Sequence, residues 1–179
     1  MKASGMTEKN TAHRWRPADP ADIGVIYDIQ CIAHALQPEA HDVLLERLLL
    51  CPQGCFVLEN GGVVSGYVLS HPWVRRAPSP IDVRLGAIPA EADAWYLHDL
   101  ALLPGTRGSG AGAKVSALLA EQARLAGYRT VALVSVNGSQ GFWEGQGFSV
   151  RMDDALAAKL ECYGGQAVYM ERDLPGRGS

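Results

Sequence analysis

The sequence has no excess of basic residues, no segment resembling a signal peptide and no long uncharged hydrophobic run. Its 16 Lys and Arg residues stand against 19 Asp and Glu residues, which gives a net charge of −3 and a pI near 5.9. Proteins that bind nucleic acid usually carry a basic excess, so we expect no nucleic-acid partner. Without an apolar leader or spanning segment, we also expect no membrane partner and a cytoplasmic location.

The four cysteines do not form a metal-binding or disulfide pattern. Cys51 and Cys55 are close together, but no second close pair or histidine partner accompanies them. We therefore expect no metal site and reduced, mostly buried thiols.

The 179 residues are enough for one domain with a substantial core and hardly enough for two. A hydrophobic content of 47% with 20% charged residues is ordinary for a globular protein. The polar start lacks periodicity, so we expect a tail over residues 1–13, a single domain over residues 14–174 and a short tail over residues 175–179.

The most informative stretch combines an apolar segment, a glycine-rich loop and an amphipathic segment. Residues 95–103 are apolar and aromatic and end before Pro104, as in a buried strand. Glycine occupies positions 105, 108, 110 and 112. Apolar residues then recur at helical spacing up to Gly127, which is placed to end a helix. A loop between a strand and a helix N-terminus is a ready anion site, because unpaired amides and the helix dipole point together.

Three phosphate-binding patterns compete for this loop. The nucleotide-hydrolase loop fails, because no Lys-Ser or Lys-Thr pair follows Gly110. The dinucleotide pattern is weak, because Ala113 stands where its last glycine belongs. The third pattern, Arg, two residues, Gly, one residue, Gly, is matched by Arg107, Gly110 and Gly112.

This third pattern resembles the acetyl-coenzyme-A loop of the GNAT superfamily of N-acetyltransferases. The resemblance covers nearly the whole chain, and it implies acetyl-CoA as co-substrate, with the loop amides holding the pyrophosphate. It also implies that residues at the end of the preceding strand contact the thioester and the pantetheine arm. The implied cofactor-binding residues are Leu102, Leu103, Arg107, Gly108, Ser109, Gly110, Ala111, Gly112 and Asn137.

The rest of the chain agrees with that family's order of elements. We expect strands at 14–17, 55–59, 63–73, 95–103, 130–136, 147 onward and 167–173, and helices at 23–36, 39–50, 113–126, 140–146 and 155–160. Asn60-Gly61-Gly62 predicts a hairpin turn. The fold class is therefore α/β: a GNAT-like mixed, twisted sheet of about seven strands with helices on both faces and a V-shaped split for acetyl-CoA.

Two connections are expected to face the acceptor. His34, Gln37 and Glu39 lie between the first two helices, where they could touch substrate or remain surface polar residues. The proline-rich segment 74–91 is expected to be a loop over the acceptor side. Its three arginines could bind an acidic substrate or be solvated.

His98 is the expected general base, because its ordinary pKa is near neutral and the resemblance places it in register with a histidine of arylalkylamine N-acetyltransferases. A buried structural histidine is the alternative. Strand alternation predicts that His98 and Asp99 point to opposite faces, so that only one of them enters the cleft.

The general acid is less clear. Many GNAT enzymes carry a tyrosine four residues before the last Gly-Phe pair, but this position is Trp143, which has no useful acid proton. Tyr163 is our catalytic prediction for that role, with Tyr96 or water as alternatives. Cys162 has no base nearby in sequence and is not expected to be a nucleophile.

The expected function is acetyl transfer from acetyl-CoA to a primary amine of a small molecule, by direct attack in a ternary complex. The alternatives are a protein N-terminal or lysine acetyltransferase and a non-catalytic acyl-CoA-binding domain. Strand edges leave a homodimer open.

Overall fold

The computed structural model of the chain describes residues 13–176. The predicted N-terminal tail, apart from His13, and the last three residues lie outside the described residues. No helix within this range is long and apolar enough to cross a membrane.

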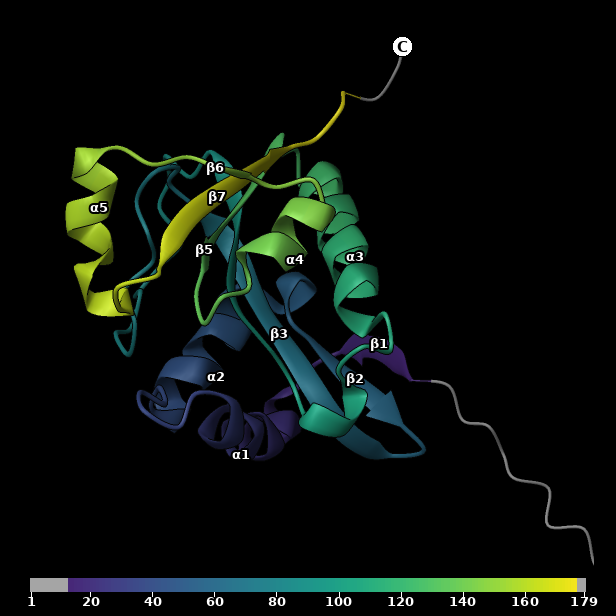
Figure 1. Ribbon diagram of the computed structural model, residues 1–179. Coiled ribbons are helices and arrows are strands. Elements are labelled where there is room, and N and C mark those ends of the chain that lie inside the picture. Colours follow the sequence, from purple (N-terminus) through teal and green to yellow (C-terminus); the bar gives the residue numbers. More distant parts are fainter. Residues whose placement is uncertain (1–12, 177–179) are drawn as a thin grey trace, which may run out of the picture.

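The elements follow the predicted order (Figure 1). They are β1 (Arg14–Pro17), α1 (Ile23–Ala33), α2 (His41–Leu50), β2 (Phe56–Asn60), β3 (Val63–Trp73), β4 (Ala94–Leu102), α3 (Ala111–Leu125), β5 (Thr130–Ser135), α4 (Gln140–Gly145), β6 (Ser149–Val150), α5 (Asp154–Leu160) and β7 (Val168–Asp173). Helix α1 ends three residues earlier than expected, and α3 begins two residues earlier.

The seven strands form one sheet in the order β1-β2-β3-β4-β5-β7-β6. Only the central pair, β4 and β5, is parallel, so the sheet is mixed as predicted. The β2–β3 hairpin turns through Gly61 and Gly62, whose φ angles of 59° and 86° suit glycine. Helix α3 ends at Leu125, and Gly127, two residues further on, again has a positive φ.

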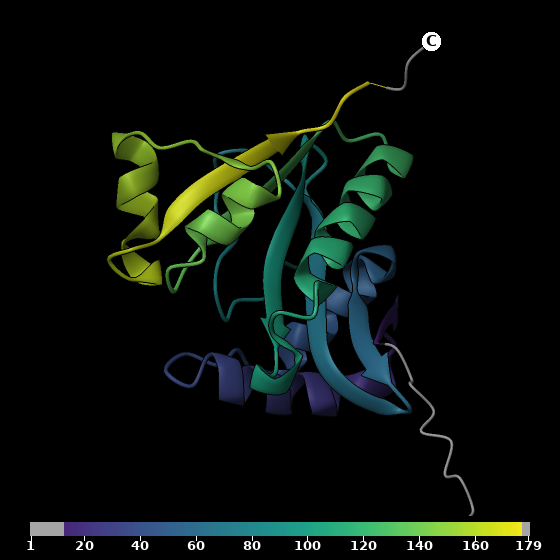
Figure 2. The same cartoon turned by 45° about the vertical axis from the view of Figure 1, so that its right-hand side comes forward.

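Helices cover both faces of the sheet. Val115, Leu119 and Ala123 of α3 pack with Trp95 and Leu97 of β4 in one buried cluster. The opposite face buries α1 and α2 against β2 and β3, and α5 against β5 and β7. Figure 1 shows α3 along the right, α1 and α2 below and α5 at the left, and the turned view in Figure 2 shows α3 alongside the long central strands.

Strands β4 and β5 separate partway along their length. They pair from Trp95 with Val131 to Leu97 with Leu133, whereas β4 continues to Leu102 beside β3. The backbone edge of β4 that faces β5 is thus left without a strand partner beyond Leu97 in the described chain. This separation is the V-shaped split that we expected.

Candidate functional site

A cavity of about 620 Å³ occupies the split between β4 and β5. Its walls come from β4, β5, the glycine-rich loop, the start of α3 and the aromatic side chains of α4. We call it the donor cavity. Among the predicted cofactor-binding residues, it is lined by Leu102, Arg107, Gly108, Gly110, Ala111, Gly112 and Asn137. Leu103 packs against the α1 side instead, and the Ser109 hydroxyl accepts from the Ala111 amide at 3.4 Å.

The loop has the geometry of an anion site. Gly108 and Gly110 have φ angles of 79° and 80°, a region that side chains other than glycine rarely adopt. The turn they form leads into the first turn of α3, where the amides of Gly112 and Ala113 find no acceptor within residues 13–176. Free amides at a helix N-terminus attract a negative group such as a phosphate.

A β-bulge at His98 decides what β4 presents to the site. Leu69 of β3 pairs with Asp99 and the next residue, Ser70, pairs with Leu97, so His98 is the extra residue. The bulge interrupts alternation and places His98 and Asp99 on the same face. Both line the donor cavity and a second cavity beside it. The expectation that only one of them enters the cleft was therefore wrong, because simple alternation holds only for an unbulged strand.

His98 is held by a buried carboxylate. Its Nε2 lies 2.6 Å from Oε1 of Glu39, and the two side chains are only 4% and 6% exposed. Burial by itself would raise the pKa of Glu39. The bond to His98, the charges of His98 and Arg47 and the amide of Asp82 outweigh burial and lower the pKa to about 2. Glu39 is thus an ionised carboxylate at any working pH. It accepts a hydrogen bond from Nε2 of His98, so the ring carries a hydrogen on that nitrogen.

Arg47 of α2 ties this carboxylate to the loop over the second cavity. Its side chain is fully buried and lies 3.5 Å from Oε2 of Glu39. The same guanidinium donates to the carbonyl oxygens of Pro80 at 2.8 Å and Val83 at 3.3 Å. Segment 74–91 therefore lies over the acceptor side, as predicted, and buried polar contacts fix it there.

The second cavity, which we call the acceptor cavity, also measures about 620 Å³. It is walled by the end of α1, the α1–α2 connection, β4, the end of β5 and residues 161–164. Ile81 of the loop lines it. His34, Gln37 and Glu39 all line it, so the α1–α2 connection forms one wall of the site. Glu39 is buried, His34 is partly buried and Gln37 is exposed.

Tyr163 lies in the acceptor cavity and not in the donor cavity. Its hydroxyl donates to the carbonyl oxygen of Ser79 in the overlying loop. Burial raises the pKa of this hydroxyl to about 12. A general-acid role for Tyr163 remains a prediction, and it requires the hydroxyl to leave this carbonyl.

The arginines of the loop are engaged elsewhere. Arg75 pairs with Glu171, Arg76 with Asp153 and Arg84 with Asp42. None of the three lines either cavity, and within residues 13–176 no Lys or other Arg lines the acceptor cavity. The idea that they bind an acidic substrate is therefore not supported by their positions.

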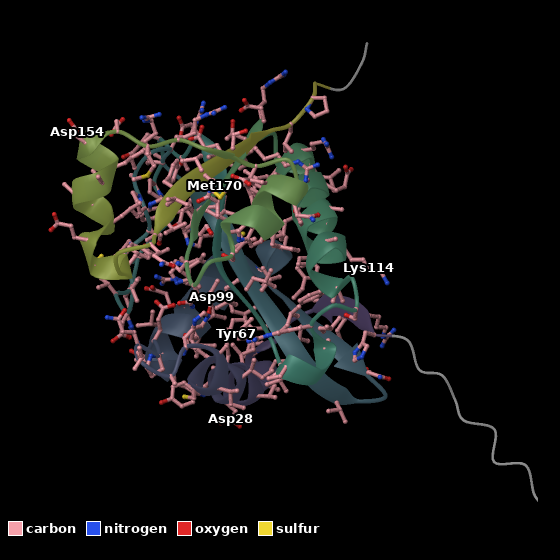
Figure 3. All side chains as sticks on the ribbon, viewed as in Figure 1. Asp28, Tyr67, Asp99, Lys114, Asp154 and Met170 are labelled. Atoms are coloured by element: carbon pink, nitrogen blue, oxygen red, sulfur yellow. The ribbon has the colours of Figure 1, made fainter. Side chains whose placement is uncertain are left out.

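A second pair joins α1 to β4 beside the bulge. Nε2 of His34 lies 2.9 Å from Oδ1 of Asp99, and the Tyr67 hydroxyl of β3 donates to Oδ2. Asp99 and Tyr67 are labelled side by side in Figure 3, at the centre of the molecule above α1. Residue types alone did not reveal this arrangement, because its members are 32 and 65 positions apart in the sequence.

His71 lies behind His98, with their ring centroids 6.0 Å apart. Its Nδ1–H donates to the carbonyl oxygen of Pro72, while its buried Nε2 has no partner in the described part of the chain. Burial, the nearby His98 and Arg47 lower its pKa from 6.5 to about 3. His71 is therefore neutral in the folded protein, and an uncharged ring backs the His98–Glu39 pair.

We predict an acid-labile stability that depends on His71. Unfolded chains protonate this ring below pH 6.5, whereas the folded protein resists protonation down to about pH 3. The free energy of unfolding should fall as the pH falls through this window, by up to about 1.4 kcal/mol per pH unit from this group. His71→Asn, which keeps a donor for Pro72, should reduce that slope in urea unfolding. Equal slopes for His71→Asn and the exposed control His41→Asn would contradict the prediction.

The chain matches the model of the acetyltransferase (GNAT) family over residues 23–148, and it belongs to that family. The matched region contains the first helices, the bulged strand, the glycine-rich loop and the final Gly-Phe pair. A search among curated proteins found no match by sequence.

Solved structures share the fold at low identity. The GphF GNAT-like decarboxylase in complex with isobutyryl-CoA superposes with a TM-score of 0.73 at 20% identity, covering 90% of this chain and 100% of that one. YncA from Salmonella typhimurium with its cofactor acetyl-CoA superposes with a TM-score of 0.64 at 19% identity, covering 94% of this chain and 97% of that one. The ribosomal-protein-S18-alanine N-acetyltransferase from Escherichia coli superposes with a TM-score of 0.65 at 16% identity, covering 93% of this chain and 97% of that one. These likenesses establish the fold and leave the substrate open.

Proposed function

We propose that this protein is an N-acetyltransferase that moves an acetyl group from acetyl-CoA to a primary amine of a small molecule. The observation that carries the proposal is the junction of two cavities at the bulge: a donor cavity with an anion-binding loop meets an acceptor cavity at His98 and Asp99. Acyl-CoA ligands bound to structural neighbours support the assignment of the donor cavity.

The overlying loop favours a small acceptor over a protein surface. Arg47 and Tyr163 fix the backbone of residues 79–83 across the acceptor side, and Ile81 lines the cavity. A polypeptide acceptor would require an open groove at this position. The absence of Lys and Arg from the cavity lining further favours an amine, which is a cation in solution, over an anionic acceptor.

His98 is suited to remove the proton of the attacking amine. Glu39 accepts the Nε2 hydrogen, so when the ring is neutral its lone pair is on Nδ1, which is buried without a partner in residues 13–176. A buried acceptor that lacks a partner is costly. Nδ1 is not exposed to the acceptor cavity in this structure, so the ring must shift for Nδ1 to accept from an amine or a water molecule there. Acetyl-CoA supplies an already activated thioester, so these side chains mainly position reactants and move protons.

Binding of acetyl-CoA is tested first by thermal unfolding. At about 100 times its dissociation constant, acetyl-CoA should add ~2.7 kcal/mol to the free energy of unfolding. For a domain of this size, the midpoint should rise by roughly 5–10 °C. Arg107→Glu reverses the charge at the loop and should remove most of this rise. Arg151→Glu, an equally exposed arginine outside both cavities, should keep it.

Turnover separates the remaining functions. An amine panel with acetyl-CoA, followed by release of the coenzyme A thiol, should show acetylation of small primary amines. Faster acetylation of peptide N-termini or lysines would favour a protein acetyltransferase. A thermal rise without thiol release on any amine would indicate a non-catalytic acyl-CoA-binding domain. No rise with acetyl-CoA at saturation would remove the basis of the proposal.

A further inference from the structure

The donor cavity has no tyrosine in the position from which GNAT enzymes commonly protonate the departing thiolate. Trp143 lines it there, and its indole is no acid. The hydroxyl of Ser139, which also lines it, already donates to the carbonyl oxygen of Val136 at 2.8 Å. Tyr163 lies only in the acceptor cavity. The side chains that line both the donor and the acceptor cavities lie where the amine and the thioester meet, and these are the candidates for a proton donor.

His34 is such a group. It follows α1 directly, where its backbone amide donates to the Gln30 carbonyl at 2.7 Å, and its side chain lines both cavities. The ring is held through Nε2 by Asp99, whose other carboxylate oxygen accepts from Tyr67. Nδ1 makes no hydrogen bond within residues 13–176 and is free to act on a ligand. The side chain remains 25% exposed, so solvent can restore its proton.

The charges around His34 favour the imidazolium. The bond to Asp99 and the negative charges of Asp99 and Glu39 raise its pKa, and they outweigh the opposing effect of burial. These carboxylates come from β4 and from the connection after α1, and the Tyr67 hydroxyl of β3 faces the pair without a charge. A ring whose pKa is raised keeps its proton to higher pH and can give it to a stronger base in the site.

We propose that His34 is the general acid that protonates the departing coenzyme A thiolate, an inference that rests on the proposed function. The amine first loses its extra proton to solvent; the neutral amine nitrogen then bonds to the acetyl carbon, and the carbon–sulfur bond breaks with its electron pair passing to sulfur. The sulfur takes the Nδ1 proton of the His34 imidazolium, while His98 takes the proton of the amine. Solvent then returns a proton to His34 and accepts the one on His98.

The test compares His34→Gln with His41→Gln, a change of an exposed histidine outside both cavities. His34→Gln should lower kcat by about tenfold to a hundredfold, at the low end for general acids because a thiolate leaves readily. The KM for the amine and the thermal rise with acetyl-CoA should change little. The fall of kcat at alkaline pH, which reports loss of the acid proton, should disappear. His41→Gln should behave as wild type.

Asp99→Asn tests whether His34 acts as an acid, because a purely structural role of His34 would not change the pH dependence of kcat. Without the carboxylate, the pKa of His34 should fall, so the alkaline limb of kcat should shift to lower pH, and an NMR titration of the His34 ring should shift with it. Wild-type kcat and an unchanged alkaline limb in His34→Gln would overturn the inference while leaving the acetyltransferase intact. An alkaline limb unmoved by Asp99→Asn would also overturn it. A wild type that neither binds acetyl-CoA nor releases thiol would fail the proposed function itself, and the inference with it.

Discussion

Replacing His98 with glutamine should lower kcat by about 10²- to 10⁴-fold, the usual contribution of a general base. Glutamine retains a donor that can reach Oε1 of Glu39, so the buried carboxylate keeps a partner, but it offers no basic lone pair. The donor cavity depends on the loop and on α3, so acetyl-CoA should still raise the unfolding midpoint by the wild-type amount. Steady-state kinetics with the best amine of the panel would measure the loss.

The acid limb of the pH profile separates a base from a packing residue. If His98 is the base, the decrease in kcat that the wild type shows at low pH should be absent in His98→Gln. His41→Gln controls for loss of a histidine as such. A variant at position 98 that keeps kcat within about threefold, well below the usual contribution of a general base, would assign His98 a structural role.

Most of the fold could be predicted because its signals are local. Apolar segments bounded by proline and glycine marked the strands, and helical spacing up to Gly127 marked α3. The glycine-rich loop was recognisable because positive φ angles at Gly108 and Gly110 restrict the residue type at those positions. The separation of β4 and β5 was expected only from the family resemblance, and the structure shows that the ladder between them ends at Leu97 and Leu133.

The chemistry of the site was harder to predict because it depends on contacts between distant residues. One inserted residue in the β4 ladder at His98 turned two neighbouring side chains to the same face, and no turn residue in the sequence marks that bulge. Glu39 was identified only as a possible substrate contact. Its partner His98 is 59 positions away, and a buried carboxylate in a connection has no local pattern. Burial and pairing of this kind emerge only once the sheet and helices are assembled.

Replacing Arg47 with methionine should destabilise the protein by about 3–5 kcal/mol, the usual cost of removing one partner of a buried ion pair. The guanidinium is fully buried and joins Glu39 to the carbonyl oxygens of Pro80 and Val83. Methionine fills similar space but leaves these acceptors without their donor. The unfolding midpoint should fall by roughly 6–20 °C for a domain of this size. Arg47→Lys keeps the charge but loses the planar guanidinium, so its unfolding midpoint should lie between those of the wild type and Arg47→Met.

A double-mutant cycle shows whether the pair acts as one unit. Glu39→Gln alone removes a carboxylate that its partners keep ionised in spite of burial, and the combined variant with Arg47→Met should cost less than the sum of the two single changes. Simple additivity would mean that Arg47 acts through the loop carbonyls and not through Glu39. In either case, the amine KM should rise in Arg47→Met because residues 80–83 lose their anchor. The midpoint shift caused by acetyl-CoA should persist, because the donor cavity does not contain Arg47.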